Sequence, residues 1–367
     1  METLQLDPTR ALYENLTLDE ERALYGITHA AVRSCTFDGP ADGESALKEA
    51  SDITVTDCEF RLRYPFWHVK GGRVESCTLT DTCRAALWYA SDLVIENTTL
   101  GGIKALRECD NMTLSDCTVN SAEFGWICRG VEMENCRMSG EYPFFMTRGL
   151  HLKNFELKGK YSFQYVEDCT ISDSVLDTKD AFWHAKNITV TDSTVKGEYL
   201  GWYSEGLTLV RCRIEGTQPL CYCKNLTLID CEMVGCDLAF ENSTVTATVK
   251  GHVDSIKSPA SGRIEVDSVG EVVYERAPVD GQGCEILVRS GKTACPCCGC
   301  KTLSTRGQYD ICPVCFWEDD PIAEKYPDEA HGCNGVSLTE AQNNYKTVGA
   351  CREDMVSHVR EPRKDEM

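Results

Sequence analysis

Four cysteines near the C-terminus have the type and spacing of a metal site. Two short runs, Cys295-Pro-Cys-Cys298 and Cys312-Pro-Val-Cys315, each contain a C-x-x-C motif. Two such motifs can converge on one tetrahedral zinc ion, and proline after the first cysteine stiffens the turn that aims both thiolates. Because four thiolates close the coordination sphere, we expect one structural zinc ion bound by Cys295, Cys298, Cys312 and Cys315.

Other cysteines beside these motifs leave the ligand set ambiguous. Cys297 and Cys300 form a rival C-x-x-C motif in the first run. We prefer Cys295 and Cys298 because proline then lies between the cysteines of both motifs. A redox role for the spare thiols, or a two-metal site that includes Cys333, stays as an alternative. Residues 337–340, Ser-Leu-Thr-Glu, have the form of a capping box, so a short helix is expected to start there.

A second group of chemically capable residues is aromatic. Five of the six tryptophans occupy one position of a repeat. Charged groups and histidines stand among them, which suits a cleft for a polar ring such as a sugar, or a protein partner. The predicted ligand-binding residues are His68, Trp88, Lys104, Arg107, Trp126, Tyr165, His184, Trp202 and Tyr203. Two runs of Phe-Trp-His-x-Lys lie several repeats apart, so His68 and His184 cannot share a metal ion.

Three carboxylates near these aromatics are candidate acids or bases. If the cleft belongs to a carbohydrate-active hydrolase or lyase, Asp180, Glu123 and Glu108 are the candidate catalytic residues. None of them forms an obvious adjacent pair, so a non-catalytic binding scaffold is the favoured hypothesis and the enzyme is the alternative. Lys104 and Glu123 occupy equivalent positions on neighbouring repeats, so a simple ion pair between them is the structural interpretation.

The repeat itself predicts the fold. Apolar residues lie five and three positions before a pivot and two after it, which is the alternation of short strands, and no helical period separates them. From Thr98 onward the pivots are 19 residues apart. We therefore predict a mainly β protein, a single-stranded right-handed parallel β-helix of about 12 coils of 19 residues, followed by a small zinc-ribbon-like module. The pivots are Cys35, Cys58, Cys77, Thr98, Cys117, Cys136, Phe155, Ser174, Ser193, Cys212 and Cys231.

Stacked coils would place equivalent residues in columns along the axis. The pivot cysteines are expected in the interior, and the Asp or Asn before most pivots is expected at a left-handed corner. Regular alternation in the aromatic segment predicts that the Trp column and the small residues two positions later face inward. Phe66, Phe163 and Phe182 would then face outward. Whichever set of side chains faces outward, the outer face of this segment is rich in apolar side chains and must contact a ligand, the tail or another subunit.

Several runs resemble known families. Residues 22 to about 275 resemble a bacterial family of unknown function with the pectate-lyase-like β-helix fold, through residues 39–48, 63–68, 178–184 and 197–202. Residues 294–340 resemble the cysteine-rich CPCC domain family, through Cys295-Pro-Cys-Cys298 and residues 309–320 and 334–338. The first resemblance implies a fold and no activity. The second implies a zinc-binding module.

The composition limits which classes of binding partner and which cellular compartment are expected. The chain has 58 acidic and 37 basic side chains and a net charge of -21, which argues against nucleic acid and anionic membranes as partners. No signal peptide or membrane span is evident, and 23 cysteines suit a reducing compartment, so we expect a cytoplasmic protein. The oligomeric state stays open. The expected domains are a cap at 1–28, the β-helix at 29–276, a linker at 277–292 and the cysteine-rich module with its C-terminal helix at 293–367.

Overall fold

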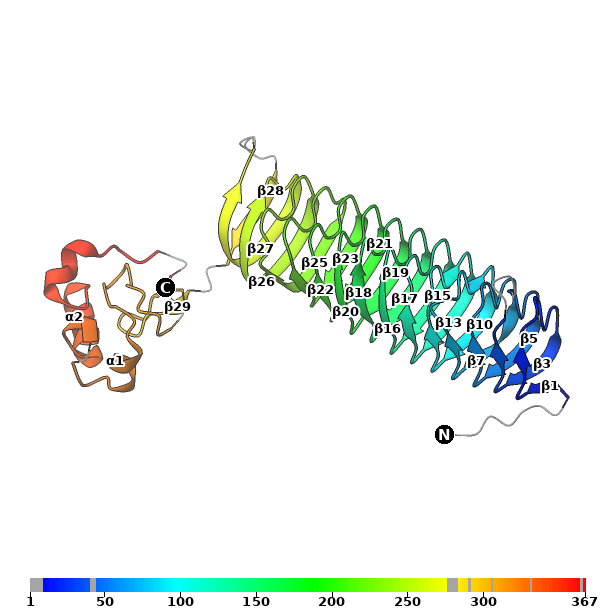
Figure 1. Cartoon of the computed structure of the whole chain (residues 1–367). Coiled ribbons are helices and arrows are strands. Elements are labelled where there is room, and N and C mark those ends of the chain that lie inside the picture. Colours follow the sequence, from blue (N-terminus) through cyan, green and yellow to red (C-terminus); the bar gives the residue numbers. More distant parts are fainter. Residues whose placement is uncertain are drawn as a thin grey trace. The chain divides into compact units, whose positions relative to one another are not determined.

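The computed structural model describes residues 9–39, 44–275, 283–289, 292–304, 306–330, 332–363 and 366–367. The chain divides into two compact units, Met1–Val288 and Arg289–Met367. The first is a parallel β-solenoid, a stack of coils that runs from β1 to β28 (Figure 1). Among the described residues, no helix is long and apolar enough to cross a membrane.

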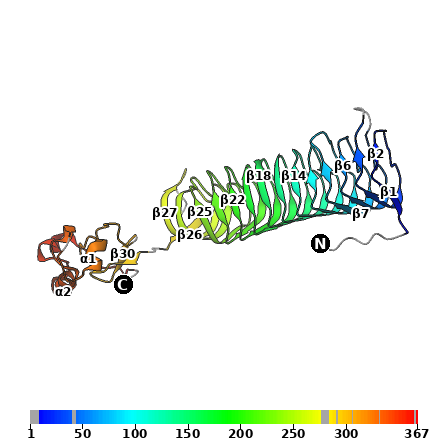
Figure 2. The ribbon, with the colours of Figure 1, turned by 60° about the horizontal axis from the view of Figure 1, so that its bottom comes forward.

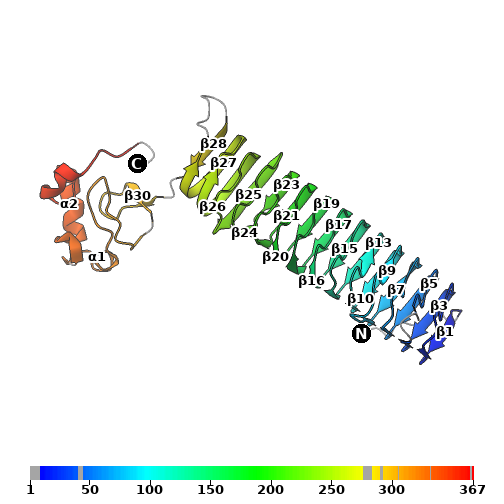
Figure 3. The same cartoon turned by 45° about the horizontal axis from the view of Figure 1, so that its top comes forward.

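One side of each coil is a strand of four to six residues. Each strand pairs in parallel with the equivalent strand of the next coil, as Asp110 pairs with Arg129 and Arg129 with Arg148. These strands form a continuous row (Figure 3). They are β1 (Ala11–Glu14), β3 (Thr28–Arg33), β5 (Ser51–Thr56), β7 (Lys70–Glu75), β10 (Ser91–Glu96), β13 (Asp110–Ser115), β15 (Arg129–Glu134), β17 (Arg148–Lys153), β19 (Glu167–Ser172), β21 (Lys186–Thr191) and β23 (Glu205–Val210).

A shorter strand follows each of these across a corner. Figure 2 shows part of this second row. Its members are β2 (Thr17–Leu18), β4 (Thr36–Phe37), β6 (Glu59–Phe60), β8 (Thr78–Leu79), β11 (Thr99–Leu100), β14 (Thr118–Asn120), β16 (Arg137–Glu141), β18 (Glu156–Lys160), β20 (Val175–Lys179), β22 (Thr194–Lys196) and β24 (Arg213–Glu215). In the last coils both rows merge into longer strands, β25 (Leu226–Val234), β26 (Thr244–Lys257) and β27 (Ser261–Val273), and β28 (Cys284–Val288) closes the stack.

The predicted fold is confirmed, with about 14 turns in place of about 12. Two boundaries differ from those expected. Residues 11–18, assigned to a cap, already form strands β1 and β2, which pair with β3 and β4. Strand β28, assigned to the linker, pairs with β27. Within that linker, residues 277–282 and 290–291 lie outside the described residues, as do residues 1–8 of the cap.

The interior and the corner before each pivot are as predicted. The seven pivot cysteines are at most 2 % exposed. The corner residues have φ between 46° and 55°, the left-handed region that Asp and Asn tolerate best. They are Asp57, Asn97, Asp116, Asn135, Asn154, Asp173, Asp192 and Asp230.

The third side of each coil is the aromatic segment, and here the predicted orientation is wrong in part. The small column, with Val69 and Ala185 among its members, is buried as predicted, but Phe66, Phe163 and Phe182 are also fully buried. Trp67 and Trp183, one position after Phe66 and Phe182, are half-buried at the outer surface. The segment is a series of turns with left-handed residues, such as φ 58° at Tyr161 and 57° at Tyr165, and a left-handed residue breaks the alternation of a strand. Only the shortest strands occur in it, β9 (Leu87–Trp88) and β12 (Leu106–Arg107).

The second unit is small and built around cysteines. Its core contains Trp317, which is 0 % exposed, five cysteines of the two motif regions and Cys351. The hairpin β29 (Thr293–Ala294) and β30 (Lys301–Leu303) brackets the first motif. Helix α2 (Leu338–Val348) starts at Ser337, whose side chain accepts a hydrogen bond from the Glu340 amide, so the predicted helix start is confirmed. The other helices are α1 (Pro321–Lys325), η1 (Gly332–Asn334) and η2 (Glu353–His358).

Candidate functional site

The two C-x-x-C motifs fold as matching turns. The Gly299 amide donates to the Cys295 carbonyl at 2.9 Å, and the Phe316 amide donates to the Cys312 carbonyl at 2.8 Å. The residue after the second cysteine is left-handed in both turns, with φ 77° at Gly299 and 61° at Phe316. Glycine adopts this conformation without cost, whereas phenylalanine does so only under strain, so the surrounding structure must hold the second turn in place.

The four predicted ligands come together with metal-site geometry. Their sulfur atoms all lie within 4.8 Å of one another. The Cys295 and Cys315 sulfurs are 3.6 Å apart, and those of Cys298 and Cys312 are 3.7 Å apart. A tetrahedral zinc ion with Zn–S bonds of about 2.3 Å requires sulfurs about 3.8 Å apart. A disulfide requires about 2.05 Å. The cluster therefore fits a four-thiolate metal ion and not a pair of disulfides.

The rival cysteines lie outside this cluster. Cys297 and Cys300 are buried nearby, and the Cys300 sulfur is 3.9 Å from the Tyr345 hydroxyl. Cys333 is exposed. In the ranges that the structure describes, the four-cysteine cluster is the one group of three or more His, Cys, Asp or Glu side chains placed to hold an ion. The sulfurs of the first motif that join the cluster are therefore those of Cys295 and Cys298 and not those of the rival pair, Cys297 and Cys300.

Neighbouring groups hold the cysteine cluster from two sides. The Thr302 hydroxyl lies 2.9 Å from the Cys312 sulfur, where it can donate to a thiolate. Gln342 of helix α2 donates its side-chain amide to the Pro296 carbonyl at 2.9 Å. The Cys351 amide donates to the Cys315 carbonyl at 2.6 Å. Helix α2 and the segment after it therefore fix both turns, which is the arrangement of a structural site.

The aromatic segments form a continuous outward surface, here called the aromatic strip. It has three columns, a turn column, the Trp column three residues later and an exposed column directly after that. Each exposed-column amide donates to the Trp-column carbonyl of the next coil, as His184 does to Trp202 at 3.0 Å. The exposed column contains His68, Tyr89, Glu108, Ile127, Met146, Tyr165, His184, Tyr203 and Tyr222.

The tryptophans form the floor of the strip. The Trp126, Trp183 and Trp202 indole N–H groups donate to main-chain carbonyls of the next coil at 2.6, 2.8 and 2.8 Å. Trp67 stacks on Trp88 with ring centroids 5.8 Å apart, and Trp183 stacks on Trp202 at 5.5 Å. The indole N–H groups of Trp126, Trp183 and Trp202, and the stacked faces of the two Trp pairs, therefore help to hold coils together.

The exposed column presents ring edges and not ring faces. Tyr165, His184, Tyr203 and Tyr222 stack in succession with centroids 4.9, 5.0 and 4.9 Å apart and interplanar angles of 11°, 9° and 12°. Each ring inside the ladder is covered on both faces by its neighbours. What faces the solvent is a row of apolar edges and polar tips that repeats at the coil spacing.

A family model described as a protein of unknown function (DUF3737) matches residues 11–287. The chain belongs to this family. The cysteine-rich CPCC family model matches residues 293–366, the part that contains the four-cysteine cluster. No curated relative matches the chain.

Three solved structures are similar to the DUF3737 solenoid at low identity. QnrB1, a plasmid-mediated fluoroquinolone resistance protein, is 13 % identical over 65 % of this chain and 92 % of its own, with a TM-score of 0.18. HetL, a pentapeptide repeat protein from Nostoc sp. strain PCC 7120, is 12 % identical over 61 % and 89 %, with a TM-score of 0.17. The catalytic domain of a GH87 alpha-1,3-glucanase is 9 % identical over 77 % and 62 %, with a TM-score of 0.19.

The predicted ligand-binding residues lie at two depths in the aromatic strip. His68, Tyr165, His184 and Tyr203 lie in the exposed column. The others are half-buried, and the Arg107 guanidinium carbon lies 5.4 Å from the Trp126 ring centroid. Sequence reasoning missed Tyr89, Ile127, Met146 and Tyr222, which complete the exposed column. Each of them directly follows a Trp-column residue in the sequence. This position would have identified them as exposed if the segment had been predicted as turns and not as a strand.

The three candidate catalytic carboxylates have separate partners in the DUF3737 solenoid. Glu123 forms an ion pair with Lys104 at 3.2 Å, which confirms the structural interpretation of that pair. Glu108 accepts from Arg107 at 3.1 Å and from the Trp88 indole at 3.4 Å. Asp180 shares the turn column with Glu123 but lies three coils further on, about 14 Å away. A glycosidase needs about 5 to 9.5 Å between its two carboxyl groups.

Asp180 has a different partner, which the sequence did not reveal. Asp180 and Glu198 lie on adjacent coils, and both contact the Lys179 ammonium, at 3.9 and 3.7 Å. Asp180 is only 6 % exposed. Burial raises its pKa, Lys179 lowers it and the Glu198 charge raises it, with a net shift upward. A carboxyl group so covered is poorly placed to reach a substrate.

The raised pKa of Asp180 makes a pH-dependent prediction. Because the folded state disfavours the ionised carboxyl, the charge destabilises the fold at neutral pH, and this penalty disappears as the pH falls through the raised pKa towards its ordinary value of 3.8. Asp180→Asn should therefore raise the melting temperature at pH 7 and have no such benefit below pH 3.8. Thermal melts across this range, with Asp177→Asn at an exposed aspartate of strand β20 as control, would check it. A lower melting temperature for the Asn variant at pH 7 would contradict the prediction.

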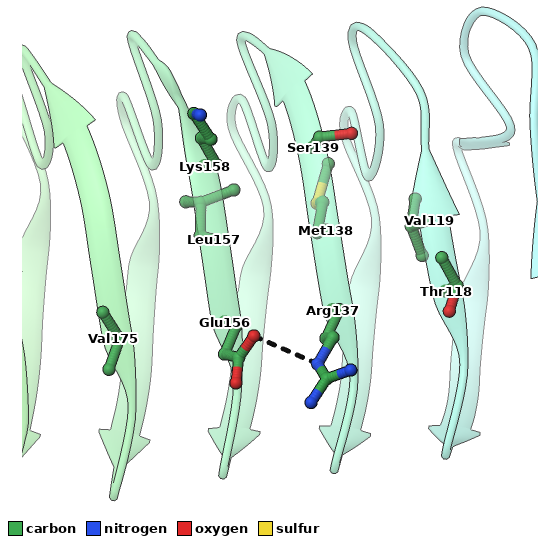
Figure 4. Close-up of a pocket in the computed structure, with 9 residues that line it drawn as sticks. All are labelled: Thr118, Val119, Arg137, Met138, Ser139, Glu156, Leu157, Lys158 and Val175. Carbon is green, nitrogen blue, oxygen red and sulfur yellow. Dashed lines mark ion pairs between the residues drawn. The ribbon is translucent and has the colours of Figure 1, made fainter.

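The hollow that Figure 4 shows contains none of the predicted site residues. It lies over strands β14, β16, β18 and β20, and its charged side chains include the Arg137–Glu156 ion pair at 3.0 Å (Figure 4). Arg137 is 76 % exposed and Glu156 60 %, so the charges are solvated and the hollow is shallow. It has no convergent set of polar groups and therefore offers no alternative site.

Proposed function

We propose that this protein is a non-catalytic binding scaffold whose aromatic strip docks a protein partner. The observation that carries the proposal is the edge-on exposed column. Tyr165, Met146, Tyr203 and Ile127 are 47, 49, 46 and 44 % exposed although each is apolar or aromatic. A run of such side chains along many coils is costly to leave in water and is typical of protein interfaces.

The ring geometry favours a protein over a carbohydrate. Sugar rings bind aromatic side chains by lying on an exposed ring face, and the ladder from Tyr165 to Tyr222 has its inner faces covered by stacking. Ring edges and hydroxyl groups instead suit a surface of side chains, which can pack between them and bind the polar tips.

The tail supports the scaffold as a zinc-loaded structural module. We infer one zinc ion per chain, because the sulfur spacing fits a zinc tetrathiolate and all four ligand positions are taken by protein. No disulfide joins any of the 23 cysteines in the structure. Free thiols in this number support a reducing compartment, so we place the protein in the cytoplasm.

Site-specific crosslinking tests the docking surface. A photo-crosslinking phenylalanine analogue would replace Tyr203 in the full chain, in cells that express it. The control replaces Val175, which is 50 % exposed on the β20 strand of the second row. We expect protein adducts from position 203 and not from position 175, and no binding of the purified protein to a glycan array. Glycan binding that is lost in Tyr203→Ala, without protein adducts at 203, would overturn the proposal in favour of a carbohydrate site.

A further inference from the structure

We propose that the partner of the aromatic strip is a second copy of this chain, bound antiparallel about a two-fold axis through Met146. This inference rests on the proposed docking function of the strip and names its occupant. Met146 is the middle member of the exposed column, with four members before it and four after it. The axis passes across the strip at Met146. A coil that lies a given number of steps before Met146 in one copy then faces the coil that lies the same number of steps after Met146 in the other copy.

The first argument is the spacing of the strip. Its exposed rings recur every 4.9 to 5.0 Å. A partner that contacts all nine coils must repeat with the same step, because any other step drifts out of register within a few coils. A second copy has the same step because its coils are identical. The ring edges of one copy can then lie between those of the other.

The second argument is the apolar centre. About this axis Met146 meets its own copy, Ile127 faces Tyr165, and Tyr89 faces Tyr203. Beneath them Trp88 faces Trp202. Exposed apolar and aromatic side chains of the strip therefore meet around the centre of the interface, where burial is most complete.

The third argument is charge. Two copies of a chain with net charge -21 repel each other, so they can associate only through a face whose charges match. Two rows of side chains border the strip. The first rim is Lys70, Ser91, Asp110, Arg129, Arg148, Glu167, Lys186, Glu205 and Lys224. The second rim is Arg63, Arg84, Ile103, Ala122, Glu141, Lys160, Lys179, Glu198 and Thr217.

The same axis pairs opposite charges along both rims. In the first rim Asp110 faces Lys186, and Arg129 faces Glu167. In the second rim Arg84 faces Glu198. Within the exposed column Glu108 faces the His184 ring. Each of these pairs occurs twice in the dimer. The like-charged pair off the axis is Lys70 with Lys224, at the two ends of the strip, where water screens it.

Charged residues on the axis are already neutralised within each chain. Arg148 meets its own copy there, but it is paired with Glu167 at 3.0 Å. Glu141 also meets its own copy, and it is paired with Lys160 at 2.9 Å. Self-contact at these two positions therefore brings together ion pairs and not bare charges, which removes the main electrostatic obstacle to a two-fold arrangement.

The size of the strip is sufficient for a stable dimer. Eight steps of about 4.8 Å give a length of about 38 Å. With its rims the strip is on the order of 20 Å wide, so each copy would bury on the order of 800 Å². Stable protein interfaces bury about 800 Å² per partner.

The oligomeric state of the full, metal-loaded chain tests the proposal. Light scattering after size exclusion, and sedimentation velocity, should give a dimer for the wild type at 50 µM. Met146→Glu should be a monomer, because it brings two carboxylates together on the axis. Val175→Glu is the matched control, since Val175 is 50 % and Met146 49 % exposed, and it should stay dimeric.

A charge-exchange cycle tests the register. Asp110→Lys and Lys186→Asp should each weaken the dimer at least tenfold, and the double variant should recover to within threefold of the wild type. Within one chain these residues are four coils apart, about 19 Å, so recovery must come from contact between copies. Absence of recovery would overturn the antiparallel register.

The results separate this inference from the proposed function. A monomeric wild type, or a Met146→Glu dimer, would overturn self-association through the strip. In that case an adduct between position 203 and a different protein would leave the docking function standing. The absence of any position-203 protein adduct would overturn both.

Discussion

Replacing Cys312 with serine is expected to remove the metal from this protein and to unfold its tail. The wild type should contain about one zinc ion per chain, and Cys312→Ser should contain none, because the loss of one of four thiolates opens a closed site. Zinc binding in such small modules supplies about 10 to 16 kcal/mol, which is most of the free energy that folds them. Elemental analysis gives the metal content, and limited proteolysis reports on unfolding of residues 289–367.

Cys333→Ser is the matched control for this change. Cys333 lies in the same unit, is exposed and is outside the four-sulfur cluster. It should keep its zinc and its protease resistance. The solenoid, a separate compact unit, should stay folded in both variants. A Cys312→Ser protein that retains a full equivalent of zinc would show that Cys297 or Cys300 can serve as a ligand.

Phe182→Ala is expected to destabilise the solenoid far more than Tyr203→Ala does. Phe182 is 0 % exposed and stacks on Phe163 with centroids 4.8 Å apart. Removing it leaves a cavity in the core, at a cost of about 3 to 5 kcal/mol in the free energy of unfolding. Tyr203 is 46 % exposed, so its removal leaves no core cavity and costs mainly its ring contacts with His184, Trp202 and Tyr222, about 1 kcal/mol.

Urea denaturation of both variants measures the difference. The comparison decides which residues of the aromatic segment face the core. If Phe182→Ala cost no more than Tyr203→Ala, Phe182 would lie outside the core, where the alternation of a regular strand would place it.

Local patterns were enough to predict the cysteine cluster and the solenoid. The spacing of Cys295, Cys298, Cys312 and Cys315 places four sulfurs around one point once each motif forms a tight turn, and such turns depend on only a few neighbouring residues. The repeat predicted the stacked coils in the same way. Its corner Asp and Asn residues, its buried cysteines and its 19-residue step are all properties of a single coil that stacking repeats.

The orientation of the aromatic segment could not be predicted in this way. Alternation holds only while φ stays in the extended region, and here residues as different as Tyr64, Lys104, Glu123 and Phe163 are left-handed. Lysine, glutamate and the aromatics carry no intrinsic preference for that region. They adopt it because the short turn must return the chain to the next coil, which is a constraint set by stacking.

The sequence alone therefore determined what depends on near neighbours, namely the cysteine cluster, the coil period, the corners and the inward cysteine column. Only the tertiary structure decided that the phenylalanines fill the core, that tyrosine and histidine edges line the outer face, and that Asp180 meets Glu198 and not Glu123. Those outcomes depend on how each coil bends to lie on the next. The conformation of each turn is determined by contacts between residues that are 19 positions apart in the sequence. A pattern of neighbouring residues therefore does not predict it.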